Sequence, residues 1–232
     1  MVDPTDKTLL GIDVFRTLSP DDCRVVASRC HWHRYAAGQQ ILSYPDTSTE
    51  VYFIVGGKVR VTLCSPSGRE VTFRDLGSGQ MFGDLSAIDG KGRSANVVAL
   101  TDSLVAAMPS NVFREVRHEH PEVAEAVLQE AVRLVRHLSE RVFEFGALGV
   151  KNRIHAELLR LARAHMRDER SAEIRPAPIH ADIASRVCTH REAVSRELSE
   201  LQRAGLVERR RGALLIHDVP RLTRMVTEVR GD

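Results

Sequence analysis

Residues 178–207, PIHADIASRVCTHREAVSRELSELQRAGLV, hold two short apolar patterns at helical spacing with a break between them. Apolar residues that recur three or four positions apart mark the buried side of a helix. The first such side is formed by Ile183, Ala184 and Val187, and the second by Val194, Leu198 and Leu201. The stretch therefore predicts a helix-turn-helix motif.

Four polar residues occupy an adjoining face of the second helix, near its N-terminus. Arg191, Glu192, Ser195 and Arg196 stand at i, i+1, i+4 and i+5, and this part of a recognition helix meets base edges. Arginine binds guanine through two acceptors and glutamate accepts from the cytosine amino group, so the set fits a G·C-containing half-site. An alternative is that Thr189 and Glu192 form only a capping box; that is compatible with base reading but does not account for the arginines.

The next segment, GLVERRRGALLIHD at 205–218, has two apolar runs around three arginines and a glycine, which predicts a β-hairpin wing. We expect Arg209, Arg210 and Arg211 to meet DNA phosphates, with a merely solvated turn an equal alternative for any one of them. Residues 151–232 carry 17 basic and 12 acidic side chains, whereas residues 1–150 have a net charge of −3. This asymmetry favours a polyanion partner for the C-terminal part.

The N-terminal part has a different pattern. Residues 18–30 predict a helix with Ser19 as N-cap and Pro20 at the first position. Residues 35–110 hold short β-branched runs separated by glycines, which predicts an antiparallel sandwich or jelly roll. The sequence SPSG at 65–68 predicts a hairpin turn.

Residues 122–145 predict one long helix without proline or glycine. Its apolar residues alternate at spacings of three and four, which is a heptad seam and favours a partner helix in a dimer. Packing against its own sandwich is the alternative. The seam comprises Leu128, Ala131, Val135, Leu138, Val142 and Phe145. GALG at 146–149 predicts a helix break and a hinge, and residues 167–178 predict a polar loop.

The segment FGDLSAIDGKGRSANV, at 82–97, combines glycines, one arginine and small polar residues. Gly83 allows a ligand to approach the backbone, and DLSAI predicts a helical turn whose free N–H groups favour an anion. Arg93 supplies a charge-assisted fork for a phosphate, Ser94 adds a hydroxyl, and Asp84 can accept from sugar hydroxyls. A simple salt bridge between Arg93 and Asp84 is an equally weighted alternative.

These motifs, in this order and joined by a long helix, resemble the Crp/Fnr family of bacterial transcription regulators over nearly the whole chain. Arg191, Glu192 and Arg196 fall on the three base-reading positions of that family, and Ser195 fits its Fnr-type variant. GQMFGDL and GRSA are similar to the phosphate-binding cassette of its cyclic-nucleotide-responsive members, in which Leu85 follows the Gly-Asp pair. The resemblance implies that Gly83 and Asp84 hold the ribose, Arg93 and Ser94 hold the cyclic phosphate, and the long helix covers the base.

The resemblance also implies an α+β fold: an N-terminal β-roll (jelly-roll) cyclic-nucleotide-binding domain at 1–120, a dimerisation helix and hinge at 121–149, and a winged helix-turn-helix DNA-binding domain at 150–232. The expected partners are a second copy of the chain, double-stranded DNA with a palindromic site, RNA polymerase, and cyclic GMP or cyclic AMP as allosteric ligand. A Crp/Fnr-like constitutive DNA-binding regulator with a vestigial pocket is the alternative.

Three residues depart from the family pattern. Asp84 stands in place of a glutamate and is one methylene shorter, and Cys188 replaces the usual glycine of the helix-turn-helix turn. Leu138 stands where the cyclic-AMP receptor has a threonine that meets the adenine amino group, while the following Ser139 is kept. Because leucine has no acceptor for that amino group, the sequence slightly favours cyclic GMP over cyclic AMP.

Other functions find little support. No apolar run is long enough to span a membrane, and the acidic N-terminus is unlike a signal peptide, so we expect a cytoplasmic protein. The four cysteines are scattered along the chain and are interpreted as free thiols. His118-Glu119-His120 is interpreted as solvated surface. We therefore expect no metal and no cofactor. The sequence also disfavours an enzyme, because it shows no nucleophile–base pair.

Overall fold

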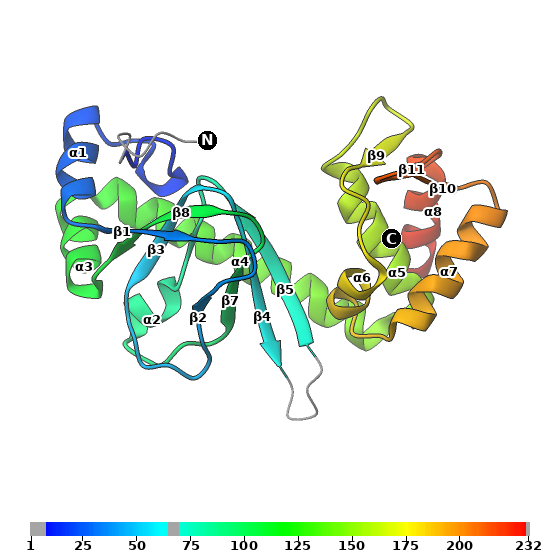
Figure 1. Cartoon of the computed structure of the whole chain (residues 1–232), viewed down its shortest axis with the longest axis horizontal. Helices are drawn as coiled ribbons and strands as arrows, with labels where there is room; N and C mark the ends of the chain where they lie inside the picture. Colours follow the sequence, from blue (N-terminus) through cyan, green and yellow to red (C-terminus); the bar gives the residue numbers. More distant parts are fainter. Residues whose placement is uncertain (1–7, 65–69, 231–232) are drawn as a thin grey trace. The chain divides into compact units, whose positions relative to one another are not determined.

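The computed structural model describes residues 8–64 and 70–230, and Figure 1 traces their course. The chain forms two compact units, the first ending at Val135 and the second beginning at Arg136. This division falls within the longest helix, α4 (Pro121–Ala147). The turn predicted at 65–68 lies outside the described residues.

The first unit is built on two antiparallel four-stranded sheets with the strand orders β1-β8-β3-β6 and β2-β7-β4-β5. The strands are β1 (His31–Tyr35), β2 (Gln40–Leu42), β3 (Val51–Gly56), β4 (Lys58–Cys64), β5 (Glu70–Gly77), β6 (Met81–Phe82), β7 (Asn96–Ala99) and β8 (Ser103–Met108). Strands that follow one another along the chain often lie in different sheets, so that the chain winds between the two sheets. This arrangement is the predicted β-roll.

Helices cover the first of these sheets and bury its apolar side chains. They are η1 (Asp13–Phe15), α1 (Pro20–Ser28), α3 (Ser110–Glu119) and the first part of α4, while α2 (Asp84–Asp89) follows β6. Phe53 of β3 lies between Phe15 and Phe113, with ring centroids 4.8 and 6.2 Å away. The predicted helix at 18–30 is confirmed: Ser19 Oγ accepts from the Asp22 backbone N–H at 3.1 Å, and Pro20 begins the helix.

The second unit contains the end of α4 and a winged helix-turn-helix (Figure 1). Its elements are α5 (Val150–Arg163), β9 (Ala172–Ile174), α6 (His180–Arg186), α7 (Arg191–Arg203), β10 (Val207–Arg210), β11 (Ala213–Ile216) and α8 (Val219–Arg230). Every apolar residue assigned from sequence to the two short helices is buried in one core with α5 and α8. The helix-turn-helix and the hairpin β10–β11 are therefore confirmed.

Two details differ from the sequence prediction. Residues 167–178 are not all loop, because β9 pairs with β11 and adds a third strand to the wing sheet. Ala172 and Ile174 are buried there. This short segment forms a strand because it pairs with the edge of β11 and packs its two apolar side chains. The long helix continues through Gly146 and Ala147, and the chain leaves helical geometry only at Leu148–Gly149.

Candidate functional site

Gly83 marks the start of the predicted ligand segment, and its backbone requires glycine. Its φ is +75°, a left-handed conformation that disfavours side chains. A Cβ there would lie 2.7 Å from Arg93 Nη1 and 3.0 Å from the Glu50 carbonyl oxygen. Glycine therefore permits the close approach of Arg93 to the backbone between β6 and α2.

Arg93 is a buried cation with one unused donor nitrogen. Its side chain is 2% exposed; Nε donates to Ser48 Oγ at 2.9 Å and Nη1 donates to the Gly83 carbonyl at 3.1 Å. Within the described residues Nη2 has no hydrogen-bond partner, and the nearest carboxylate oxygen, Glu50 Oε2, is 3.9 Å away. Burial lowers the pKa of Arg93, while Tyr52, Glu50 and Asp46 raise it. Arginine stays charged in proteins, so an anion that reached Nη2 would meet a buried positive group.

The acid beside Arg93 is Glu50, not Asp84, so the predicted alternative of an Arg93–Asp84 salt bridge is wrong. Glu50 Oε2 also accepts from the Tyr52 hydroxyl at 3.4 Å, and burial raises the pKa of Tyr52 to about 12. Sequence reasoning missed Ser48, Glu50 and Tyr52, because they belong to a segment some 40 residues before Arg93. A backbone hydrogen bond from the Arg93 N–H to the Asp46 carbonyl, at 2.7 Å, holds the two segments together. Their spacing along the chain gave no signal.

Asp84 lies beside a different ion pair. It is 8% exposed, and burial raises its pKa, with Glu130 adding to the rise. Backbone N–H groups and Arg74 act in the opposite direction. Arg74 of β5 forms an ion pair with Glu130 of α4 at 3.4 Å. The Asp84 carboxyl therefore lies in a buried position next to one cation and one further acid, Arg74 and Glu130.

The remaining predicted ligand residues are more open. Leu85 and Ser94 have exposed side chains on the same segment as Gly83 and Arg93. Leu138 and Ser139 are exposed on the part of α4 that belongs to the second unit. The structure thus brings Gly83 into direct contact with Arg93.

The turn before the recognition helix has a left-handed residue. Cys188 has a φ of 51°, the conformation for which glycine is usual, and so accepts the strain expected from sequence. Helix α7 begins at Arg191 after His190, and its N-cap makes no side-chain hydrogen bond. The predicted alternative of a capping box from Thr189 and Glu192 is therefore wrong.

The polar face of α7 is open where the sequence predicted base contacts. Arg191, Glu192 and Arg196 are exposed, whereas Thr189 and Ser195 are half-buried. Ser195 Oγ lies 2.6 Å from His180 Nδ1. Three side chains, on the first turns of the helix, are thus free to meet a partner, and Ser195 has a partner within the protein.

A buried pair fixes the other side of α7. His155 Nε2 of α5 lies 2.6 Å from Glu197 Oε1, and both side chains are buried. Lys151 Nζ donates to Glu200 at 3.0 Å. Sequence analysis missed this pair, because a histidine on one helix and a glutamate on another show no common pattern. The pair thus links the recognition helix to α5 through a buried contact.

The three wing arginines have different surroundings. Arg209 Nη1 lies 3.1 Å from His180 Nε2. Arg210 donates to both carboxylate oxygens of Glu208 at 2.8 and 3.0 Å. Arg211 is exposed in the two-residue turn that ends at Gly212, whose φ is +73°. Arg209 thus contacts the first residue of α6, while Arg210 pairs along its own strand.

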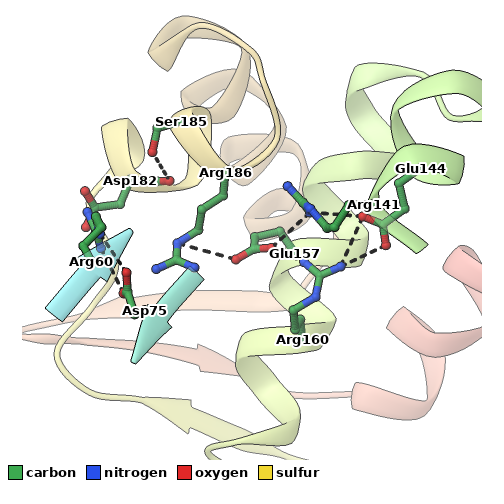
Figure 2. A network of polar contacts seen from close by, with 9 residues as sticks. All are labelled: Arg60, Asp75, Arg141, Glu144, Glu157, Arg160, Asp182, Ser185 and Arg186. Atoms are coloured by element: carbon green, nitrogen blue, oxygen red, sulfur yellow. Dashed lines mark hydrogen bonds and ion pairs between the residues drawn. The ribbon is translucent and has the colours of Figure 1, made fainter. Parts of the chain in front are cut away.

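A cluster of buried charges joins the end of α4 to α5 and α6 (Figure 2). Glu144 is 0% exposed; it accepts from Arg141 at 3.1 Å and from Arg160 at 2.9 Å. Glu157 also pairs with Arg160, and its oxygens lie 3.7 Å from both Arg141 and Arg186. Burial, followed by Arg160, lowers the pKa of Arg141. The cluster ties residues on both sides of the break at 148–149 into one unit.

The described residues contain no group of three or more histidine, cysteine, aspartate or glutamate side chains arranged to hold a metal ion. Among the same residues, no helix has the length and apolar character needed to cross a membrane.

Comparisons with known proteins agree with this arrangement. The family model of the cyclic nucleotide-binding domain matches residues 32–120, and that of the Crp-like helix-turn-helix domain matches residues 152–225. The chain is 30% identical over 200 residues to the cyclic AMP receptor protein of Thermus thermophilus, covering 85% of this chain and 88% of that protein. It is 24% identical over 220 residues to the CRP-like cAMP-activated global transcriptional regulator of Mycobacterium tuberculosis, covering 94% and 98%.

A solved structure shows the same fold. A CooA mutant from Carboxydothermus hydrogenoformans aligns with a TM-score of 0.80 and 19% identity, over 95% of this chain and 96% of that chain. Fold and matches together define a DNA-binding regulator with a cyclic nucleotide-binding domain. The chain belongs to the Crp/Fnr family of transcription regulators, whose members are not enzymes.

Proposed function

We propose that this protein is a homodimeric transcription regulator whose DNA binding is switched by a purine cyclic nucleotide bound in the β-roll. One observation carries the proposal: among the described residues Arg93 Nη2 has no hydrogen-bond partner, although Arg93 is only 2% exposed. A buried donor without a partner costs free energy, and a phosphate oxygen would remove that cost. The cellular compartment proposed is the cytoplasm.

The ligand contacts are assigned by chemistry. Arg93 and Ser94 would bind the cyclic phosphate through charged and hydroxyl donors. The Gly83 backbone and the Asp84 carboxylate would meet the ribose, and Leu85 would lie against the ligand. Asp84 accepts best from the one free ribose hydroxyl when it is ionised, so its raised pKa predicts weaker binding in acid.

The DNA contacts follow from exposure and charge. Arg191, Glu192 and Arg196 would read base edges, with Thr189 and Ser195 beside them. Arg209 and Arg211 would meet phosphates; Arg210 would do so only by giving up its pair with Glu208. Two subunits related by a two-fold axis would read a palindromic site, and RNA polymerase would be the partner at a promoter.

The mechanism proposed is a population shift. Ligand would bind the DNA-competent arrangement of the dimer more tightly than the other arrangement, and so raise its population. Long helices would carry the change, because each α4 contributes to both compact units of its chain. We assign Leu138 and Ser139 to the base of the nucleotide, on the strength of the family resemblance alone.

Two arguments about the base point in opposite directions. Leu138 offers no acceptor to the adenine amino group, which slightly favours cyclic GMP. The relatives in Thermus thermophilus and Mycobacterium tuberculosis are named for cyclic AMP, which favours cyclic AMP.

A second candidate is a constitutive DNA-binding regulator with a vestigial pocket. The observation in its favour is that Arg93 already bonds to Ser48 and Gly83 within the protein. Such contacts would keep the segment ordered without a ligand.

Calorimetric titration with cyclic AMP, cyclic GMP and adenosine separates the two candidates. The proposal expects saturable binding of at least one cyclic nucleotide, none of adenosine, and tighter DNA binding with that nucleotide present. DNA binding that is equally tight without any nucleotide would support the constitutive regulator instead.

A further inference from the structure

His180 lies between the recognition helix and the wing, in a position that the base-reading scheme does not use. It is the first residue of α6. Its Nδ1 is 2.6 Å from Ser195 Oγ on α7, and its Nε2 is 3.1 Å from Arg209 Nη1 on β10. One imidazole therefore contacts a predicted base-reading residue and a predicted phosphate-binding residue at once.

The chemistry of these neighbours fixes where the proton lies. A guanidinium only donates hydrogen bonds, so His180 Nε2 must accept from Arg209. A neutral imidazole that accepts at Nε2 carries its proton at Nδ1 and donates there. Ser195 Oγ is the acceptor of that bond, so the serine hydroxyl keeps its own hydrogen for a partner outside the protein.

The surroundings keep His180 in this neutral form. Burial lowers its pKa, and the nearby positive charges of Arg209 and Arg191 lower it further. Those two arginines face the ring from β10 and α7. Protonation at Nε2 would set two donors against each other and break the contact with Arg209.

We infer that His180 is a positioning residue for DNA recognition, which presents the Ser195 hydroxyl as a donor and holds Arg209 beside the recognition helix. The inference rests on the proposed sequence-specific DNA binding. A fixed donor selects base edges that offer an acceptor, such as guanine O6 or N7 and thymine O4, and disfavours the amino group of cytosine. His180 would thus set base preference without touching DNA.

Two substitutions separate the two contacts. In His180→Asn the amide nitrogen stands close to the place of Nδ1, so a donor to Ser195 remains, but no acceptor reaches Arg209. In His180→Gln the amide oxygen reaches the place of Nε2 and keeps Arg209, but the donor to Ser195 is lost. A merely structural role for His180 would not distinguish these variants.

The experiment uses the 232-residue chain with saturating cyclic AMP and cyclic GMP together and a random duplex library. Sites selected by the wild type are then measured with every single base-pair change and over a salt series. We expect His180→Gln and Ser195→Ala each to lose about tenfold of preference at the same base pair, with an unchanged salt slope. His180→Asn should keep that preference and lower the salt slope by about one, and Arg209→Ala should have the same effect.

The controls distinguish failure of this inference from failure of the proposed function. Arg191→Ala should lose preference at a different base pair, and thermal unfolding should report that each variant is folded. If both His180 variants behave alike, or if neither changes base preference or salt slope, the positioning role is overturned while the proposed function stands. If the wild type selects no sequence, the proposed function and the inference fail together.

Discussion

Arg93 shows how one residue can be part of the fold and still remain available for a ligand. Two of its nitrogens hold Ser48 and the Gly83 carbonyl, so removing the side chain also removes bonds within the β-roll. A substitution of Arg93 should therefore affect both ligand binding and the stability of the β-roll.

Arg93→Leu should reduce cyclic nucleotide binding by at least about tenfold to a hundredfold, the range for losing one charge-assisted hydrogen bond of roughly 1.5–3 kcal/mol. It should also lower the unfolding temperature of the first unit. Calorimetric titration and differential scanning calorimetry measure the two effects. Lys91→Leu, an exposed cation in the same segment, is the control and should change neither. Undiminished binding by Arg93→Leu would show that the phosphate does not bind there.

His180 gives a residue-scale prediction about pH. Its pKa is lowered below 6.5 by burial and then by Arg209 and Arg191. Arg209→Ala should therefore raise the pKa of His180 in an NMR titration, with the resonance assigned from its absence in His180→Gln. Because the folded state resists protonation, the stability linked to His180 is present above about pH 6.5 and lost as pH falls toward the folded pKa. A pKa that falls or stays constant in Arg209→Ala would contradict the contact between the two side chains.

At the scale of elements, local patterns were sufficient where one segment decides its own structure. The cap at Ser19, the periodicity of α4 and the apolar faces of α6 and α7 are each contained within a single helix and its flanking residues. The strand β9 was missed because it depends on an edge of β11 some 40 residues later. In such short segments, pairing with a neighbouring strand decides the structure more than the intrinsic strand propensity of the residues does.

The candidate site follows the same rule. Gly83 and Arg93 are ten residues apart on one connection, so their proximity could be predicted. Glu50 reaches Arg93 from another strand, and His180 and Glu197 find their partners through helix packing. A single sequence does not indicate which polar side chains of different elements contact one another, because the two partners are far apart along the chain and share no spacing.

The charge cluster at the end of α4 yields an element-scale prediction. Glu144 is 0% exposed and pairs with Arg141 and Arg160. Breaking a buried pair strands its partners, so Glu144→Gln should destabilise the second unit by about 2–4 kcal/mol, somewhat reduced because Arg160 is partly exposed. Urea unfolding followed by circular dichroism measures this loss. Glu140→Gln, on an exposed turn of the same helix, should stay within about 0.5 kcal/mol; equal effects would mean that the cluster is not a stabilising contact.

For the whole molecule, the exposed apolar residues of α4 point to assembly. The described residues place large apolar side chains in water along one stripe, formed by Leu128, Val132, Val135, Leu138 and Val142. Phe145, also predicted in the seam, instead packs between Arg141 and Arg153, with the guanidinium carbons 4.6 and 5.6 Å from its ring centroid. The stripe is thus shorter than the predicted seam at its C-terminal end, and a second α4 is the partner of matching shape and chemistry.

Val135→Glu tests this assembly. Val135 is 63% exposed, and in a parallel dimer the substitution would place two carboxylates face to face in an apolar contact. We expect monomers at micromolar concentration in analytical ultracentrifugation, and loss of DNA binding. Arg136→Ala changes the net charge by the same amount beside the stripe and should remain dimeric. A dimeric Val135→Glu would mean that the chains associate through another surface.

The choice of nucleotide also involves more than one part of the molecule. The family resemblance assigns the base of the nucleotide to Leu138 of the long helix, and the phosphate to the β-roll. Cyclic AMP and cyclic GMP share their phosphate and ribose, so Arg93, Ser94, Gly83 and Asp84 cannot distinguish them. An unpaired buried amino group costs about 1–3 kcal/mol, so the leucine should weaken cyclic AMP by roughly fivefold to a hundredfold relative to a residue with an acceptor. Paired titrations of the wild type and Leu138→Thr should therefore show a gain in affinity for cyclic AMP relative to cyclic GMP. Leu138→Val, which removes a methylene without adding a hydroxyl, is the control and should leave the ratio unchanged. If threonine also leaves the ratio unchanged, residue 138 does not face the base edge, and the names of the relatives become the better guide to the ligand.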